Sequence, residues 1–127
     1  MTVATAQRKI LIVEDDADIR GLLSLRLRKS SYDVSVATDG MTALAVARRE
    51  QPDLVVLDLG LPAGDGFTVM ERMRSITSLA DVPVVVITAR DAATNREKAE
   101  ASGAVAFVEK PIDFDQLLET IDALLAP

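Results

Sequence analysis

The chain has 127 residues, which fits one domain that buries about two-thirds of its unfolded surface. Its 14 Lys and Arg residues against 20 Asp and Glu residues give a net charge of −6, which argues against direct binding to nucleic acid or to an anionic membrane surface. The absence of cysteine and histidine excludes disulfides, thiol chemistry and any site that needs an imidazole base, a histidine ligand or a phosphohistidine.

The start of the chain differs in character from the remainder. Residues 1–8 are polar and lack the apolar core of a signal peptide, so we expect a disordered tail there and a cytoplasmic protein. No apolar run approaches the ~20 residues that cross a bilayer, which argues against a membrane-spanning segment. Residues 9–127 are expected to form a single domain without an internal repeat or a linker.

The first half of this domain predicts two strands and two helices. Residues 10–13 form a short apolar run, typical of a strand buried in a sheet. Apolar side chains three or four apart over residues 18–29 predict an amphipathic helix. A shorter and more exposed strand is expected over residues 32–37, and a turn at residues 38–40 leads to a helix over residues 41–51.

The first predicted helix carries expectations for individual side chains. Asp16 or Asp18 is expected to cap its N-terminus. Leu22 and Leu25 belong to its apolar set and are expected to face the core. Arg20 is expected to point outward.

The second half predicts three more pairs of a strand and a helix. An uninterrupted apolar run over residues 54–57 predicts a central strand, followed by a loop rich in Gly and Pro over residues 60–65, where Asp65 is expected to be an N-cap. The helix over residues 91–102 has few large apolar side chains, so we expect it to be weakly anchored, and Gly103 is its expected stop. The other predicted strands are 84–87 and 105–108, and the other predicted helices are 67–74 and 114–125. The last helix is expected to be capped by Asp113 and to have Leu124 among its inward-facing side chains.

Strands that alternate with helices predict an α/β fold with a parallel sheet covered on both faces. In such sheets ligands bind beyond the carboxyl ends of the strands, at a topological switch point. The polar residues at these ends are Glu14 and Asp15 after the first strand, Asp58 after the third, Thr88 after the fourth and Lys110 after the fifth. Each alone is a weak signal, because helix caps and solvated lysines are common, but together they favour a functional site.

The grouping also has a chemical rationale. Three carboxylates at one point repel one another unless a cation neutralises them, and hard oxygen ligands suit Mg²⁺. With Lys110 and Thr88 opposite the carboxylates, the same edge forms a receptor for a phosphoryl group. We expect Asp58 to attack the phosphorus atom in line while Mg²⁺ and Lys110 neutralise the phosphoryl oxygens.

These residues lie within motifs that resemble the signature of bacterial two-component response-regulator receiver domains. The resemblance extends over nearly the whole chain, and the four motifs together are specific. The motifs are Ile-Val-Glu-Asp-Asp at 12–16, Leu-Asp-Leu-Gly-Leu-Pro at 57–62 with Asp65-Gly66, Ile-Thr-Ala at 87–89 and Val-Glu-Lys-Pro at 108–111. The resemblance implies a flavodoxin-like, doubly wound (βα)5 sheet with the strand order 2-1-3-4-5.

The resemblance also implies a role for each site residue. Asp58 matches the phospho-accepting aspartate, Asp15 and Asp58 match direct Mg²⁺ ligands, and Glu14 matches a ligand that acts through water. The backbone carbonyl of Gly60 completes the metal site, and Lys110 matches the lysine that contacts the phosphoryl group.

Three further residues match the elements that change on phosphorylation. Thr88 matches the hydroxyl residue that moves toward the phosphoryl group, and Phe107 matches the switch aromatic. Pro111 follows Lys110 at a peptide bond that is cis in most of the family.

The implied function is signalling and not enzyme catalysis, although such a domain assists its own phosphorylation and autodephosphorylation. A histidine kinase or a histidine phosphotransfer protein is the implied phosphodonor, and the downstream effector is unknown. We expect an effector, or a phosphorylation-dependent homodimer, to use the face formed by the helix over 91–102, the fifth strand and the last helix. Direct contact with nucleic acid or a membrane is not expected.

The chain departs from the family pattern at three places. Gly60 replaces a larger residue two positions after the acceptor, and Ala63-Gly64 stands where the family commonly has Gly-Met, so the mouth of the site is expected to be less shielded. Phe107 has no hydroxyl, unlike the tyrosine often found there, so any signal that it carries must depend on packing.

Other interpretations stay open at this point. The chain is expected to be either a stand-alone receiver or the N-terminal fragment of a multidomain regulator or hybrid kinase. A flavodoxin-like nucleotide or flavin binder would share the sheet, but the acids after the first strand would repel a phosphate without a metal. An aspartyl phosphatase would need a second acid where Gly60 stands, and a pure interaction module would not need so complete a site.

Overall fold

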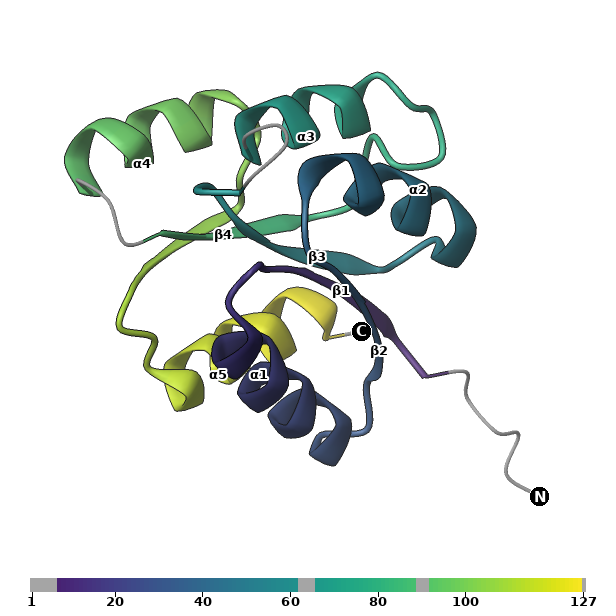
Figure 1. Cartoon of the computed structure of the whole chain (residues 1–127), viewed down its shortest axis with the longest axis vertical. Coiled ribbons are helices and arrows are strands. Elements are labelled where there is room, and N and C mark those ends of the chain that lie inside the picture. The colour runs from purple at the N-terminus through teal and green to yellow at the C-terminus, as the bar shows by residue number, and fades with distance from the viewer. Residues whose placement is uncertain (1–6, 62–65, 89–91, 127) are drawn as a thin grey trace.

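The structure, a computed structural model, describes residues 7–61, 66–88 and 92–126, with the backbone alone for residues 92–95. Most of the predicted tail over residues 1–8 and the predicted cap at Asp65 lie outside the described residues. Within them, strands and helices alternate along the chain (Figure 1). The strands are β1 (Lys9–Val13), β2 (Asp33–Ala37), β3 (Leu54–Asp58), β4 (Val84–Thr88) and β5 (Ala106–Glu109), and the helices are α1 (Ala17–Lys29), α2 (Gly40–Glu50), α3 (Gly66–Arg74), α4 (Ala92–Ala101) and α5 (Phe114–Leu125).

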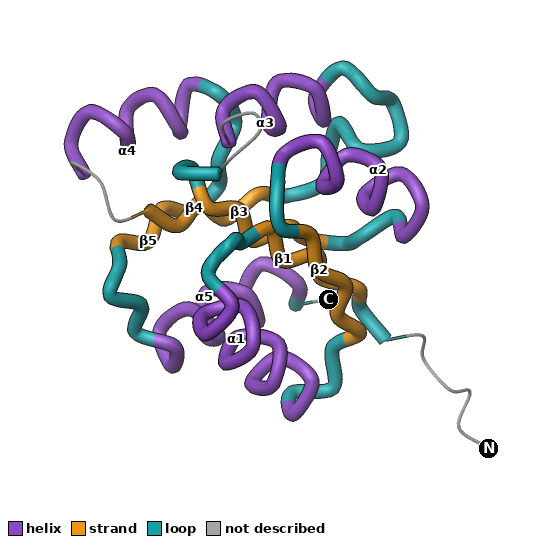
Figure 2. The backbone as a smooth tube through the Cα atoms, in the orientation of Figure 1, coloured by secondary structure: helices purple, strands orange, loops and turns teal. Residues whose placement is uncertain are grey.

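All strands are parallel and form one sheet in the order β2-β1-β3-β4-β5, so the predicted α/β fold and strand order are confirmed. Helices α2, α3 and α4 cover one face of the sheet, and α1 and α5 cover the other (Figures 1 and 2). Because β1 pairs with both β2 and β3, the order reverses at β1, which makes the carboxyl ends of β1 and β3 the switch point. None of the helices among the described residues has the length and apolar character that crossing a membrane requires.

The core has two parts, one on each face of the sheet. In β3, Val55 and Leu57 face the layer of α2 and α3, whereas Leu54 and Val56 face the layer of α1 and α5. All four side chains are completely buried, and successive strand residues point to opposite faces. This arrangement explains why the central strand is an uninterrupted apolar run and not an alternating one.

The expected orientation of three leucines is wrong. Leu22 and Leu25 in α1 are each 53% exposed, and Leu124 in α5 is 38% exposed. Leu23 and Leu27, one helical turn apart, fill the contact between α1 and the sheet. Leu22 projects about 100° away from Leu23, and Leu25 projects from the opposite side of the helix. In the connection before β4, Leu79 is fully buried although its surroundings in the sequence are polar.

Capping residues determine several helix boundaries. Asp16 caps α1 by accepting from the N–H groups of Asp18 and Ile19, and the Asp113 carboxylate accepts from the N–H of Gln116 at the start of α5. Asp39 accepts from the N–H of Thr42 at 2.8 Å, so α2 begins at Gly40, inside the predicted turn.

Candidate functional site

The acidic residues converge because their strands are neighbours in one register. Val13 of β1 pairs with Leu57 of β3, so Glu14 and Asp58, each one residue further on, follow at adjacent strand ends. The Glu14 N–H donates to the Ala37 carbonyl at 3.0 Å, which extends the pairing between β1 and β2 by one residue. These contacts hold two carboxylates at the switch point of the sheet.

Three carboxylates form one cluster there. Glu14, Asp15 and Asp58 each contribute an oxygen atom, and these atoms all lie within 4.8 Å of one another. Glu14 is completely buried and Asp58 is 5% exposed, whereas Asp15 faces solvent. Negative charges this close repel one another, and the burial of two of them strengthens the repulsion because water screens it less.

Lys110 is the cation that faces the cluster. Its Nζ atom donates a hydrogen bond to Asp58 Oδ2 at 3.1 Å and lies 2.9 Å from Glu14 Oε1. The contact with Glu14 is close in distance but lacks hydrogen-bond geometry, so the buried Oε1 atom has no hydrogen-bond donor among the described residues. The Lys110 N–H donates to the Thr88 carbonyl, which fixes the lysine against the end of β4, and the Lys110–Pro111 peptide bond is cis.

The protonation of the site reflects this shortage of positive charge. Burial, together with the adjacent Asp58 carboxylate, raises the pKa of Glu14 to about 7, although the contacts with Lys110 and the Asp16 N–H act in the opposite direction. Burial acts to lower the pKa of Lys110, but its contacts with Glu14 and Asp58 outweigh burial and raise it. The Lys110 ammonium by itself therefore does not neutralise the cluster.

The donor set fits Mg²⁺. Carboxylate oxygens are the hard ligands that Mg²⁺ prefers, and the buried Glu14 Oε1 atom accepts no hydrogen bond within the part of the chain that the structure describes. Gly60 is exposed, and its N–H donates to Asp58 Oδ1 at 2.9 Å. A Cβ atom at Gly60 would lie 3.6 Å from that same oxygen, so the glycine leaves the approach to Asp58 open.

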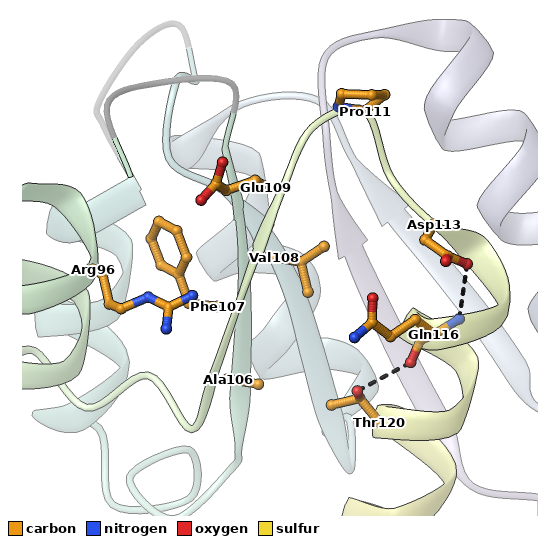
Figure 3. Close-up of a pocket in the computed structure, with 9 residues that line it drawn as sticks. All are labelled: Arg96, Ala106, Phe107, Val108, Glu109, Pro111, Asp113, Gln116 and Thr120. Carbon is orange, nitrogen blue, oxygen red and sulfur yellow. Dashed lines mark hydrogen bonds between the residues drawn. The ribbon is translucent and has the colours of Figure 1, made fainter. Parts of the chain in front are cut away.

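Thr88 and Phe107 lie on the same face of the sheet. Phe107 of β5 pairs with Val86 of β4, and Thr88 lies two residues beyond Val86, which makes Thr88 and Phe107 diagonal neighbours. Thr88 is 1% exposed, and Phe107 is partly buried against the layer of α2 and α3. The guanidinium of Arg96 in α4 lies 5.2 Å from the centroid of the Phe107 ring (Figure 3).

A surface pocket of about 320 Å³ lies beside β5. Figure 3 shows Phe107 pointing toward α4, where it meets Arg96, and Val108 pointing toward Gln116 and Thr120 of α5. The pocket does not include any of the three clustered carboxylates, so it offers a surface for contact and not a site for their chemistry.

Two residues near the site were not identified from the sequence. Arg20, expected to point outward, instead donates from Nη1 to the carbonyl oxygens of Glu14 and Asp15. Gly66 packs against the end of β3, where a Cβ atom would lie 2.9 Å from the Asp58 carbonyl oxygen. A hydropathy pattern contains no signal for either contact, although the Asp65-Gly66 pair did form part of a motif.

Known proteins with similar sequences are response regulators. The response regulator receiver domain family matches residues 10–122. The chain is similar to the DNA-binding dual master transcriptional regulator RpaA of Synechocystis, with 42% identity over 117 residues that cover 92% of this chain and 48% of RpaA. It spans about half or less of the curated relatives that it matches first.

Solved structures show the same fold. A response regulator from Chloroflexus aurantiacus has a TM-score of 0.90 and 29% identity, covering 96% of this chain and all of that one. The receiver domain of the sensor histidine kinase PA1611 from Pseudomonas aeruginosa has a TM-score of 0.87 and 26% identity, with 96% of this chain and all of that one covered. That structure has a magnesium ion coordinated in its active site cleft.

The sheet order, the acidic cluster facing a lysine and the match over nearly the whole chain agree with one another. They decide against the flavin-binding interpretation, which shares only the sheet. The chain belongs to the response regulator receiver domain family, whose members are signalling phospho-acceptors of two-component systems.

Proposed function

We propose that Asp58 is the residue that accepts the phosphoryl group, in a reaction that needs Mg²⁺. The observation that carries the proposal is the position of the Asp58 carboxylate, which contacts Lys110 Nζ at 3.1 Å and lies within 4.8 Å of Glu14 and Asp15. This places the acceptor oxygen between a cation site and an ammonium. A phosphoryl group that reaches Asp58 would therefore have its negative charge neutralised from both sides.

One oxygen of Asp58 attacks the phosphorus atom as the bond between phosphorus and the donor breaks, and the donor leaves with the electron pair. Bound Mg²⁺ supplies the positive charge that offsets the phosphoryl oxygens. The Asp15 and Asp58 carboxylates and the Gly60 carbonyl would hold the ion directly, and Glu14 would hold it through water. Lys110 neutralises a phosphoryl oxygen from the opposite side.

The phosphodonor is a histidine kinase or a histidine phosphotransfer protein, since this chain contains no histidine of its own. Two-component regulators work with such kinases and with effectors, and several relatives are longer proteins. We therefore infer that this receiver acts in the cytoplasm, either alone or as the regulatory part of a longer regulator or hybrid kinase. It also assists the hydrolysis of its own phosphoryl group.

The signal passes from Asp58 to β5 through two side chains. A dianionic phosphoryl group attracts a hydroxyl donor, and Thr88 ends the strand next to β3. Movement of Thr88 changes the space available to its diagonal neighbour Phe107, whose ring then turns inward. The face formed by α4, β5 and α5 changes as a result, and an effector or a second copy of the chain recognises it.

The test is labelling with acetyl phosphate in the presence of Mg²⁺, followed by mass spectrometry of the intact protein. We expect one phosphoryl group per chain, none in the Asp58→Asn variant and none in EDTA. Asp81→Asn, which alters an exposed aspartate at the opposite edge of the sheet, should be labelled like the wild type. Full labelling of Asp58→Asn would show that the acceptor is wrongly assigned. Unchanged labelling in EDTA would show that the reaction does not need Mg²⁺.

A further inference from the structure

The guanidinium of Arg20 joins α1 to the segment that carries the acidic pair. Its Nη1 atom donates to the Glu14 carbonyl oxygen at 3.0 Å and to the Asp15 carbonyl oxygen at 3.3 Å. Both carbonyls lie in the short connection between β1 and α1, which supplies two of the three clustered carboxylates. One side chain thus binds the backbone of both acids.

The backbone of this connection determines where the two carboxylates point. Glu14 has further restraints, because its N–H binds the Ala37 carbonyl and its Oε2 atom accepts from the Asp16 N–H at 3.1 Å. The Asp15 side chain is exposed, so its direction depends on the orientation of its own peptide groups. The contact from Arg20 to the Asp15 carbonyl fixes one of them.

Arg20 is itself held firmly by the first turns of α1. Its N–H donates to the Asp16 carbonyl at 3.0 Å, and its carbonyl accepts from Ser24 Oγ at 2.7 Å. Both hydrogen bonds come from the same atom, Nη1, at the end of a side chain that is one bond longer than that of lysine. Arginine at this position can therefore bridge two carbonyls without losing its place on the helix.

We propose that Arg20 is a positioning residue for divalent-cation binding, which acts by fixing the peptide groups of Glu14 and Asp15. The inference rests on the proposed Mg²⁺ site. Arg20 Nη1 donates to backbone carbonyl oxygens, and its own positive charge would by itself repel the ion. Positioning and charge therefore have opposite effects on affinity, which makes the two roles separable.

The experiment measures the Mg²⁺ dissociation constant of the whole chain by isothermal titration calorimetry, with circular dichroism to check folding. The variants are Arg20→Ala, Arg20→Lys and, as a matched control, Arg28→Ala. Arg28 lies on the same helix and reaches the carbonyl of Val34 in β2, away from the acidic cluster. Its removal deletes the same charge from α1 without touching the connection after β1.

We expect Arg20→Ala to weaken Mg²⁺ binding about tenfold, the effect that loss of a group orienting a metal ligand commonly has. Arg20→Lys keeps the charge but not the bridge, so its binding should also be weaker, while Arg28→Ala should match the wild type. The proposal is overturned if Arg20→Ala binds Mg²⁺ at least as tightly as the wild type, if Arg20→Lys is indistinguishable from it, or if Arg28→Ala loses as much. If Arg20→Ala does not fold, the Mg²⁺ affinity of Arg20→Lys tests the proposal. A wild-type chain that binds no Mg²⁺ would contradict the proposed function and not the role of Arg20.

Discussion

The raised pKa of the buried Glu14 carboxyl makes the stability of the folded chain depend on pH and on bound metal. Its pKa of about 7 lies above the ordinary 4.5, so without metal the folded chain holds this proton more tightly than the unfolded chain. The resulting stabilisation is complete below pH 4.5 and is lost as the pH rises through 7. A bound divalent cation reverses this preference, because it favours the ionised carboxylate.

We expect the free energy of unfolding in EDTA to fall between pH 5 and pH 7.5, by at most about 3 kcal/mol. Urea titrations at the two pH values measure it. The Glu14→Gln variant should lose this dependence, since the absence of histidine leaves few other groups to titrate in that range. An equal pH dependence in the wild type and the variant would show that Glu14 is not the group responsible.

We expect Gly60 to determine how open a phosphoryl group on Asp58 would be to water. Because a side chain at this position would start 3.6 Å from Asp58 Oδ1, the Gly60→Met variant should cover the in-line path and lengthen the lifetime of the phosphoryl group severalfold. Loss of label after the donor is removed gives the rate. Gly21→Met in α1, where a Cβ atom would meet no atom within 4 Å, is the control. If the phosphoryl group lasts no longer in Gly60→Met than in the wild type, a side chain at position 60 does not shield it from water.

At the scale of elements, the start of α3 is joined to the end of β3 by a contact that allows only glycine. A Cβ atom at Gly66 would lie 2.9 Å from the Asp58 carbonyl oxygen and from Leu59 Cα, both of them backbone atoms. We expect Gly66→Ala to lower the free energy of unfolding by about 1–3 kcal/mol, as overpacking commonly does. Gly21→Ala in α1 should instead stabilise the chain by up to about 1 kcal/mol, because alanine is the better helix former. Denaturant unfolding compares them, and a neutral Gly66→Ala would contradict the close packing.

The described side chains of helix α4, those of residues 96–101, are mostly exposed. Among its described side chains Ala99 is buried, and two cations contact rings outside the helix, Arg96 over Phe107 and Lys98 over Phe67 at 4.3 Å. Each cation–π contact of this kind contributes about 0.5–1 kcal/mol. The weak anchoring that its sequence predicts is consistent with these contacts.

We expect the amide hydrogens of α4 to exchange faster than those of α5, and faster still, about two- to fivefold, in the Lys98→Ala variant. Native-state hydrogen exchange followed by mass spectrometry measures both effects. Glu97→Ala, which removes an exposed neighbour of Lys98 on the same helix, is the control. Equal exchange in α4 and α5 would show that these ring contacts are not what limits the opening of α4.

For the molecule as a whole, the sequence predicted most of the fold because apolar runs end at charged residues. The order of elements and the meeting of Glu14, Asp58 and Lys110 follow from parallel strands whose carboxyl ends share one edge. The features that it could not predict depend on packing between elements. Whether Leu22 is covered, whether Leu79 is buried and where the guanidinium of Arg20 binds are decided by neighbours distant in sequence.

The proposed coupling between Asp58 and the face of α4, β5 and α5 would depend on the whole molecule. Thr88 ends β4, and its diagonal neighbour Phe107 is the β5 side chain that contacts α4 through Arg96. In the Thr88→Ala variant the three carboxylates and Lys110 are unchanged, so phosphorylation with acetyl phosphate should persist. The phosphorylation-dependent change in amide exchange over α4 and β5 should be lost, because alanine has no hydroxyl for the phosphoryl group to attract. If Thr88→Ala shows the full change, the signal must take another route, and the assignment of Asp58 as acceptor would still stand.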